Sequence, residues 1–246
     1  MHWHVVAIGC VIVLFAAGLR RMTGFGFAMV TVSLLSLMIS PKQSVLVALV
    51  LQLVLGIRNL RLIVRDTRWS LVPWLLVSGI AAVPIGLAVL HASDDRTLRL
   101  IVGVAVLSAL APIIGRARPP IEAGWRGATV SGFLAGLLNS LAAMPAPPLL
   151  LYLMRLKDVS LEARRATLIT MFTLLTTGAL VGHLLSGGVG SDTLLLALIF
   201  TPAALVGDHF GRNTPWAMNR RVIDAVSIAI VIGSAAILVA SAAFAS

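Results

Sequence analysis

The chain begins with two apolar runs, residues 5–19 and 27–39, which flank a basic and glycine-rich stretch. A helix over the 13 residues of the second run would be only about 20 Å long, short of the ~30 Å hydrocarbon core of a membrane. Glycine lets a helix end or turn at low steric cost, and Gly24 and Gly26 lie between the runs. The pattern therefore predicts a broken-helix hairpin with Arg20 and Arg21 at its tip.

The same pattern returns in the second half of the chain. The segment that ends at Gly18 resembles the one that ends at Gly136, at an offset of 118 residues. The predicted arms of the second hairpin are residues 128–138 and 148–154, and here prolines rather than glycines interrupt the helix. Paired interruptions of this kind in two halves point to the substrate site of a transporter.

Three plainer explanations of these features stay open. Apolar segments resemble one another easily, so the repeat could arise by chance. Glycines in membrane helices commonly serve close helix packing. Arg20 and Arg21 could mark a cytoplasmic loop after an ordinary first span, because such loops carry an excess of Lys and Arg.

Longer apolar segments separated by polar turns follow each hairpin. The predicted membrane spans are residues 44–62, 71–90, 98–114, 166–185, 193–206 and 222–243. Residues 115–127 form the predicted cytoplasmic linker, which divides one transmembrane domain into a first repeat, 1–114, and a second repeat, 128–246.

The basic residues predict an orientation for this arrangement. One assignment places 14 of the Lys and Arg residues in cytoplasmic loops and three in outer turns, with Arg20 and Arg21 at the first tip. It puts both termini on the periplasmic side and makes the halves inverted repeats, each a hairpin plus three spans, an architecture found in transporters. The loops assigned to the cytoplasm are 58–68, 115–127, 155–165 and 208–221.

Composition settles the protein class. Hydrophobic residues make up 59% of the 246 residues and charged residues 11%, and the mean hydropathy is +1.02. Soluble domains carry about 25% charged residues, so we expect an all-α integral membrane protein whose partner is the lipid bilayer. The net charge of +10 comes from residues between apolar runs, which reflects topology rather than nucleic-acid binding. Cys10 is the single cysteine, so no internal disulfide forms.

The two tips contain the residues expected to bind a substrate. A charge inside a membrane needs an anionic partner or water, and arginine recognises oxyanions through two parallel hydrogen bonds. Free N–H groups at helix ends would add partial positive charge. The predicted substrate-binding residues are Arg20, Arg21, Thr23, Gly24, Gly26, Gln52, Asn139, Ser140, Met144 and Pro145.

Other chemistry has little support in the sequence. The chain has no GxxxxGK[ST] phosphate loop, no histidine spacing typical of a metal site and no local catalytic triad motif, so we expect neither an enzyme nor a cofactor. Asp208, His209 and Asp224 are candidates for proton coupling. The alternative for these three residues is an interfacial charge beside Arg212, Arg220 or Arg221.

The positions of glycine and proline within the apolar runs resemble those of the sulfite exporter TauE/SafE family, bacterial membrane permeases with duplicated halves. The resemblance rests on the tip around Gly24 and Gly26, on Gly132 to Gly136 followed by Pro145 to Tyr152, and on residues 164–168. It covers nearly the whole chain. This chain has Met29 and Val30 where the family usually has a proline, and Ala142 and Met144 where glycine is common.

The resemblance implies a multi-pass protein of the bacterial inner membrane that exports a small sulfur-containing anion such as sulfite, sulfoacetate or another sulfonate. Together with the residues, it predicts a secondary transporter whose substrate binds between the hairpin tips at the membrane midplane. A passive anion channel on the same scaffold and a scaffold subunit without transport activity remain alternatives. A homo-oligomer is also left open.

Overall fold

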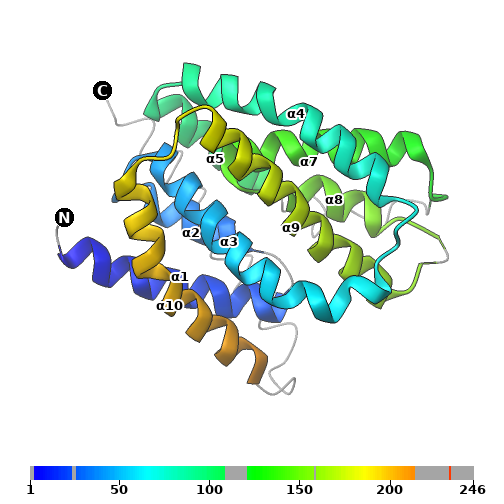
Figure 1. Ribbon diagram of the computed structural model, residues 1–246, viewed down its shortest axis with the longest axis horizontal. Coiled ribbons are helices and arrows are strands. Elements are labelled where there is room, and N and C mark those ends of the chain that lie inside the picture. The colour runs from blue at the N-terminus through cyan, green and yellow to red at the C-terminus, as the bar shows by residue number, and fades with distance from the viewer. Residues whose placement is uncertain (1–2, 24–25, 109–120, 158, 214–232, 234–246) are drawn as a thin grey trace.

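The computed structural model describes residues 3–23, 26–108, 121–157, 159–213 and Gly233, and these residues form helices joined by short turns (Figure 1). The helices of the first half are α1 (Trp3–Thr23), α2 (Phe27–Leu35), α3 (Pro41–Ile63), the short 3-10 helix η1 (Val64–Asp66), α4 (Val72–Ala92) and α5 (Asp95–Ser108). The helices of the second half are α7 (Trp125–Ala142), α8 (Ala146–Leu153), α9 (Leu161–Leu185) and α10 (Ser191–Asn213).

The helices have the length and surface of a membrane protein. Among the described residues, five helices are long and apolar enough to cross a bilayer, namely α1, α3, α4, α9 and α10. Large apolar side chains also point outward: Val11 is 68% exposed, Val77 70% and Leu198 69%. Lipid solvates such side chains, whereas a soluble protein rarely exposes extensive apolar patches. The prediction of an all-α integral membrane protein is therefore confirmed.

The first hairpin differs from the prediction in its first arm. The arm expected to end at residue 19 continues as helix α1 to Thr23, so Arg20 and Arg21 lie in its last turn. Its 21 residues span about 31 Å, enough to cross the hydrocarbon core. The second arm, α2, has only nine residues, as its short apolar run predicted. The second hairpin is similar, with 18 residues in α7 and eight in α8.

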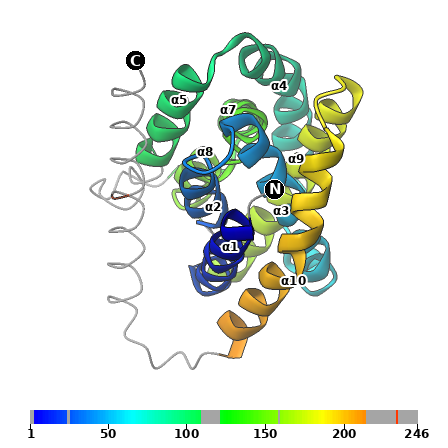
Figure 2. The same ribbon diagram turned by 90° about the vertical axis from the view of Figure 1, so that its left-hand side faces the viewer.

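Helix packing repeats between the two halves. Helix α1 packs on α10, α4 packs on α7, and α3 and α9 pack together between these two pairs (Figures 1 and 2). Within the hairpins, α1 contacts α2 and α7 contacts α8. Exchanging α1 with α7, α2 with α8, α3 with α9, and α4 with α10 turns each of these contacts into a contact of the same set.

Glycines bring α7 against α4. A Cβ atom added to Gly132 would overlap the backbone of Leu75, and one added to Gly136 would overlap that of Gly79. The partner numbers rise together along both helices, so α4 and α7 run parallel. Small residues four apart are a common device for close helix contact in membranes.

The pair α1 and α10 repeats this contact. A Cβ atom on Gly207 would overlap the backbone of Leu14, and one on Gly211 would lie 2.6 Å from the carbonyl oxygen of Gly18. These helices also run parallel. The glycine of the first repeated segment, Gly18, and that of the second, Gly136, thus serve equivalent helix contacts, as the packing explanation of these glycines proposed.

Helices α3 and α9 run in opposite directions. Gly56 lies against Thr173, and farther along the chain the backbone N–H of Arg68 donates to Thr167 Oγ1 over 2.9 Å. If the two halves are inverted copies, α3 must run antiparallel to its counterpart α9. The antiparallel α3 and α9, together with the parallel pairs α1–α10 and α4–α7, agree with that requirement. The inversion, the domain division and the side of the membrane on which each loop lies stay predictions.

Several helix boundaries differ from those predicted. Helix α7 begins at Trp125, inside the expected linker, and α9 begins at Leu161, five residues early, because Ser160 caps its first turn by accepting a hydrogen bond from Ala163 N. Helix α10 continues through Pro202 to Asn213. Most of the linker and the predicted span 222–243 lie outside the described residues.

Candidate functional site

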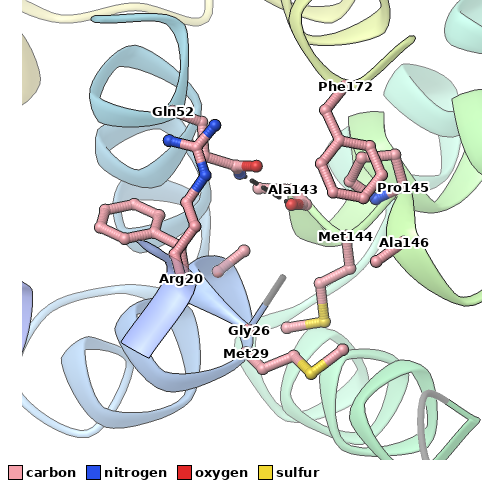
Figure 3. A pocket seen from close by; sticks show the side chains of 11 residues that line it. Arg20, Gly26, Met29, Gln52, Ala143, Met144, Pro145, Ala146 and Phe172 are labelled. Atoms are coloured by element: carbon pink, nitrogen blue, oxygen red, sulfur yellow. Dashed lines mark hydrogen bonds between the residues drawn. The ribbon is translucent and has the colours of Figure 1, made fainter. Parts of the chain in front are cut away.

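One cavity lies where the two hairpin tips meet (Figure 3). It contains about 290 Å³ of space free of protein atoms, part of which is open to solvent. We call it the tip cavity, and the described residues that line it are Arg20, Gly26, Phe27, Ala28, Met29, Gln52, Ala143, Met144, Pro145, Ala146 and Phe172.

Helix α2 begins at the wall of the tip cavity. Gly26 precedes it with φ of 97°, a left-handed conformation that glycine adopts without strain. The first intrahelical bond runs from Val30 N to Gly26 O, so the N–H groups of Phe27, Ala28 and Met29 have no partner in this ladder. A helix N-terminus with free donors and a positive dipole end favours an anion.

Helix α8 also begins at this cavity. Ala143 ends α7 in a left-handed conformation with φ of 56°, and its N–H donates to Asn139 O over 2.8 Å, as in an αL cap. Pro147 and Pro148 follow in the first turn of α8 and carry no N–H. This second N-terminus therefore offers fewer donors than that of α2.

Among the described residues that line the tip cavity, Arg20 is the charged one. Its side chain leaves the last turn of α1, is 8% exposed and points to the side of the cavity where Gln52 lies (Figure 3). Its Nη1 atom is buried and has no hydrogen-bond partner among the described residues. Arg21 is less buried and does not line the cavity. The structure thus distinguishes two arginines that the sequence left equivalent.

Gln52 lies opposite the second tip. It is 6% exposed, and its Nε2 atom donates to the carbonyl oxygen of Ala143 over 2.8 Å. Since Gln52 belongs to α3 and Ala143 to the second hairpin, this bond joins the two halves of the chain.

Asp208 lies near this cluster on α10. It is 3% exposed, its Oδ2 atom lies 3.6 Å from Arg58 Nη1, and its carboxylate interacts favourably with the charge of Arg20. This ion pair joins α10 to α3. Two of the interfacial partners expected from the sequence, Arg220 and Arg221, lie outside the described residues, so that alternative stays open. A buried carboxylate in a membrane needs such a cation.

His209, the second proton-coupling candidate, does not point into the buried cluster of Asp208 and Arg58. His209 is exposed, and its ring lies edge-on to Phe210, with ring centroids 6.3 Å apart. Asp224 lies outside the described residues.

Among the described residues, Asn139 and Ser140 were predicted to bind the substrate but do not line the tip cavity. Asn139 and Ser140 are fully buried but lie beside it, at the end of α7. The Ser140 hydroxyl donates to carbonyl oxygens of its own helix, at Gly136 and Leu137, because a serine in a helix readily bonds back to the preceding turn. Thr23 ends α1 and its side chain is not described, and Gly24 lies outside the described residues.

Sequence reasoning missed most of the apolar lining. Met29 and Ala28 lie in the first turns of α2, and Phe172 reaches the cavity from the middle of α9 (Figure 3). The sequence carries no signal for Phe172, because its place depends on how α9 packs. The position of Ala146 follows from the second tip, since it is the first residue of α8.

Comparison with known proteins gives one match. The model of the family described as Sulfite exporter TauE/SafE matches residues 9–238, which include the described residues of the tip cavity. No curated protein and no solved structure matches the chain. The family match covers nearly the whole chain, both hairpins included, and therefore the protein belongs to the sulfite exporter TauE/SafE family of membrane transporters.

Proposed function

We propose that the protein is a secondary transporter that exports a small sulfur-containing anion, such as sulfite, sulfoacetate or another sulfonate, which binds in the tip cavity near the membrane midplane. The family match supports the transport of sulfite or a related sulfur anion. The tip cavity supports the location of the site.

The observation that carries the proposal is the buried Nη1 atom of Arg20, which lacks a hydrogen-bond partner among the described residues at the wall of a cavity. A buried cation without a hydrogen-bond acceptor is costly, and a sulfonate would supply that acceptor. The N–H groups at the start of α2 would bind a second oxygen of the same head group. Both features favour an anion over a cation or a neutral solute.

Asp208 remains a candidate for coupling transport to protons. It is a buried carboxylate that interacts with Arg20, so a change in its charge would alter the attraction between Arg20 and an anion. Coupling to the membrane potential alone is the other driving force we consider.

Flux into proteoliposomes tests the proposal. We expect saturable uptake of sulfite or a sulfonate that is accelerated by the same anion on the opposite side, while the carboxylate lactate is transported poorly. A conductance that does not saturate would instead favour an anion channel. The absence of flux, together with a partner that purifies in equal amount, would favour a scaffold subunit.

A further inference from the structure

One side of helix α9 leads away from the tip cavity. Four buried side chains share this side, because they are spaced by four, three and four residues, namely Phe172, Thr176, Ala179 and His183. Phe172 lines the cavity (Figure 3), and His183 lies in the last turn of α9, about 16 Å farther along the helix. We call these four residues the α9 face.

The last turn of α7 lies against the far end of the α9 face. His183 Nε2 lies 3.2 Å from the carbonyl oxygen of Ser140. Since a carbonyl oxygen only accepts hydrogen bonds, Nε2 carries the hydrogen, and Nδ1 of the neutral ring is an acceptor. Asn139 precedes Ser140, and its carbonyl oxygen accepts from the N–H of Ala143, which lines the cavity. Asn139 is thus within one helical turn of both the cavity lining and the contact with His183.

Four buried polar atoms in this region have no hydrogen-bond partner among the described residues. They are Nδ2 and Oδ1 of Asn139, Oγ1 of Thr176 and Nδ1 of His183. Buried polar atoms nearly always have a partner in folded proteins, because a buried atom without one is costly. The amide nitrogen and the hydroxyl can donate, whereas the amide oxygen and the ring nitrogen accept. A hydrated oxyanion suits both kinds, since its oxygens accept hydrogen bonds and its water molecules donate them.

We propose that the transported anion passes along the α9 face, between the tip cavity and the side of the membrane at which α9 ends, and that Asn139 and Thr176 bind it on the way. The inference rests on the function proposed above and adds a route to its binding site. The route is closed in this conformation, because all the residues that form it are buried. Transporters open a central site to each side in turn, and here opening separates His183 from Ser140.

Thr176 and Leu175 form a matched pair for a test. They are neighbours on α9 and are 1% and 0% exposed, but their side chains point about 100° apart. Leu175 packs on α4, where a Cβ atom added to Gly79 would overlap it. Each is replaced by cysteine in a Cys10→Ser background, and the full-length protein in nanodiscs is treated with 2-sulfonatoethyl methanethiosulfonate, a thiol reagent that carries a sulfonate. Mass spectrometry of the intact protein gives the reaction rate.

The α9 face should react although it is buried. We expect Thr176→Cys to react about tenfold or more faster than Leu175→Cys, because transport opens the route whereas only unfolding exposes Leu175. Methanesulfonate, which does not attack disulfides, should slow the reaction of Thr176→Cys and leave that of Leu175→Cys unchanged. Ala179→Cys lies on the same face and should behave like Thr176→Cys, so it replaces that variant if Thr176→Cys does not fold.

A second substitution separates anion binding from folding. Thr176→Val removes a hydroxyl that has no partner among the described residues, so the melting temperature should stay the same or rise. Transport should nevertheless fall about tenfold, because the anion loses a hydrogen bond on its route. Thr170→Val is the control, since its hydroxyl lies 2.8 Å from Thr67 Oγ1. It should lower the melting temperature and leave transport per folded protein unchanged.

The outcomes separate the two proposals. Equal, slow reaction of folded Thr176→Cys and Leu175→Cys proteins would overturn the route, and wild-type transport by Thr176→Val would overturn the role of Thr176 in it. Both results leave the proposed function standing, because flux of sulfite or a sulfonate through the wild type tests that function separately. Absence of this flux would overturn the proposed function and the route with it.

Discussion

The side chain of Gln52 donates a hydrogen bond of 2.8 Å to the carbonyl oxygen of Ala143. Both residues are buried and line the tip cavity, although 91 positions separate them in the sequence. The bond ties α3 of the first half to the tip of the second half (Figure 3). Ala143 has a left-handed backbone, so the bond also stabilises a conformation that alanine adopts rarely.

Replacement of Gln52 by leucine should destabilise the protein. It leaves the carbonyl oxygen of Ala143 buried without its donor, at a cost of about 1–3 kcal/mol. The expected result is a lower melting temperature in detergent and weaker transport. Gln43→Leu is the control, because Gln43 lies partly exposed in the first turn of α3. Equal melting temperatures for the Gln52 and Gln43 variants would contradict the role of this bond.

Gly26→Ala should lower transport more than it lowers expression. The positive φ of 97° costs alanine about 1–2 kcal/mol, although a Cβ atom there would meet only Leu19, at 3.6 Å. The strain therefore acts on the backbone at the start of α2. Gly124→Ala, with φ of −139° and open space around its Cβ, is the control and should be mild. Wild-type transport by Gly26→Ala would contradict the prediction that transport depends on the left-handed backbone conformation of Gly26.

The two parallel helix pairs should be equally sensitive to added volume. Gly136→Val forces a side chain into the backbone of Gly79, and Gly211→Val does the same at Gly18. Overpacking of this kind typically costs 1–3 kcal/mol or more. Both variants should melt several degrees below the wild type, whereas Gly190→Val, with nothing within 4 Å, should not. A large effect at only one of the two pairs would argue against equivalent halves.

The inverted arrangement predicts where engineered cysteines react. In a Cys10→Ser background, a cysteine at Gly190 or Ser246 should be labelled from the periplasm, and one at Ser70 from the cytoplasm only. The prediction rests on the distribution of basic residues between loops. Membrane-impermeant maleimide applied to intact cells gives the measurement. Cytoplasmic labelling at Gly190 would contradict the topology.

The sequence was sufficient for the fold class and for the meeting of two interrupted helices. Apolar runs too short to cross a membrane, residues 27–39 in the first half and 148–154 in the second, carried that signal. It did not reveal that α1 continues through Arg20, because a helix end depends on the backbone conformation of the next residues.

The lining of the tip cavity was only partly predictable. Residues of the tips, such as Gly26, Met144 and Pro145, follow from the interruptions themselves. Phe172 does not, because many residues of α9 are equally apolar and tertiary packing alone selects one of them. Asn139 was predicted to bind the substrate, but it is not among the described residues that line the tip cavity.

The central claim is that Arg20 binds the transported anion through its guanidinium group. Lysine keeps the charge but loses the paired donors, so Arg20→Lys should weaken sulfite or methanesulfonate binding about tenfold or more. Arg21→Lys, one position along the same helix but outside the cavity lining, is the matched control and should bind within about twofold of the wild type.

The most direct test is isothermal titration of both anions into the wild type and these two variants, with melting temperatures as a check on folding. The account predicts a large loss of affinity for Arg20→Lys and little change for Arg21→Lys. Wild-type affinity in folded Arg20→Lys and Arg20→Ala proteins would contradict it.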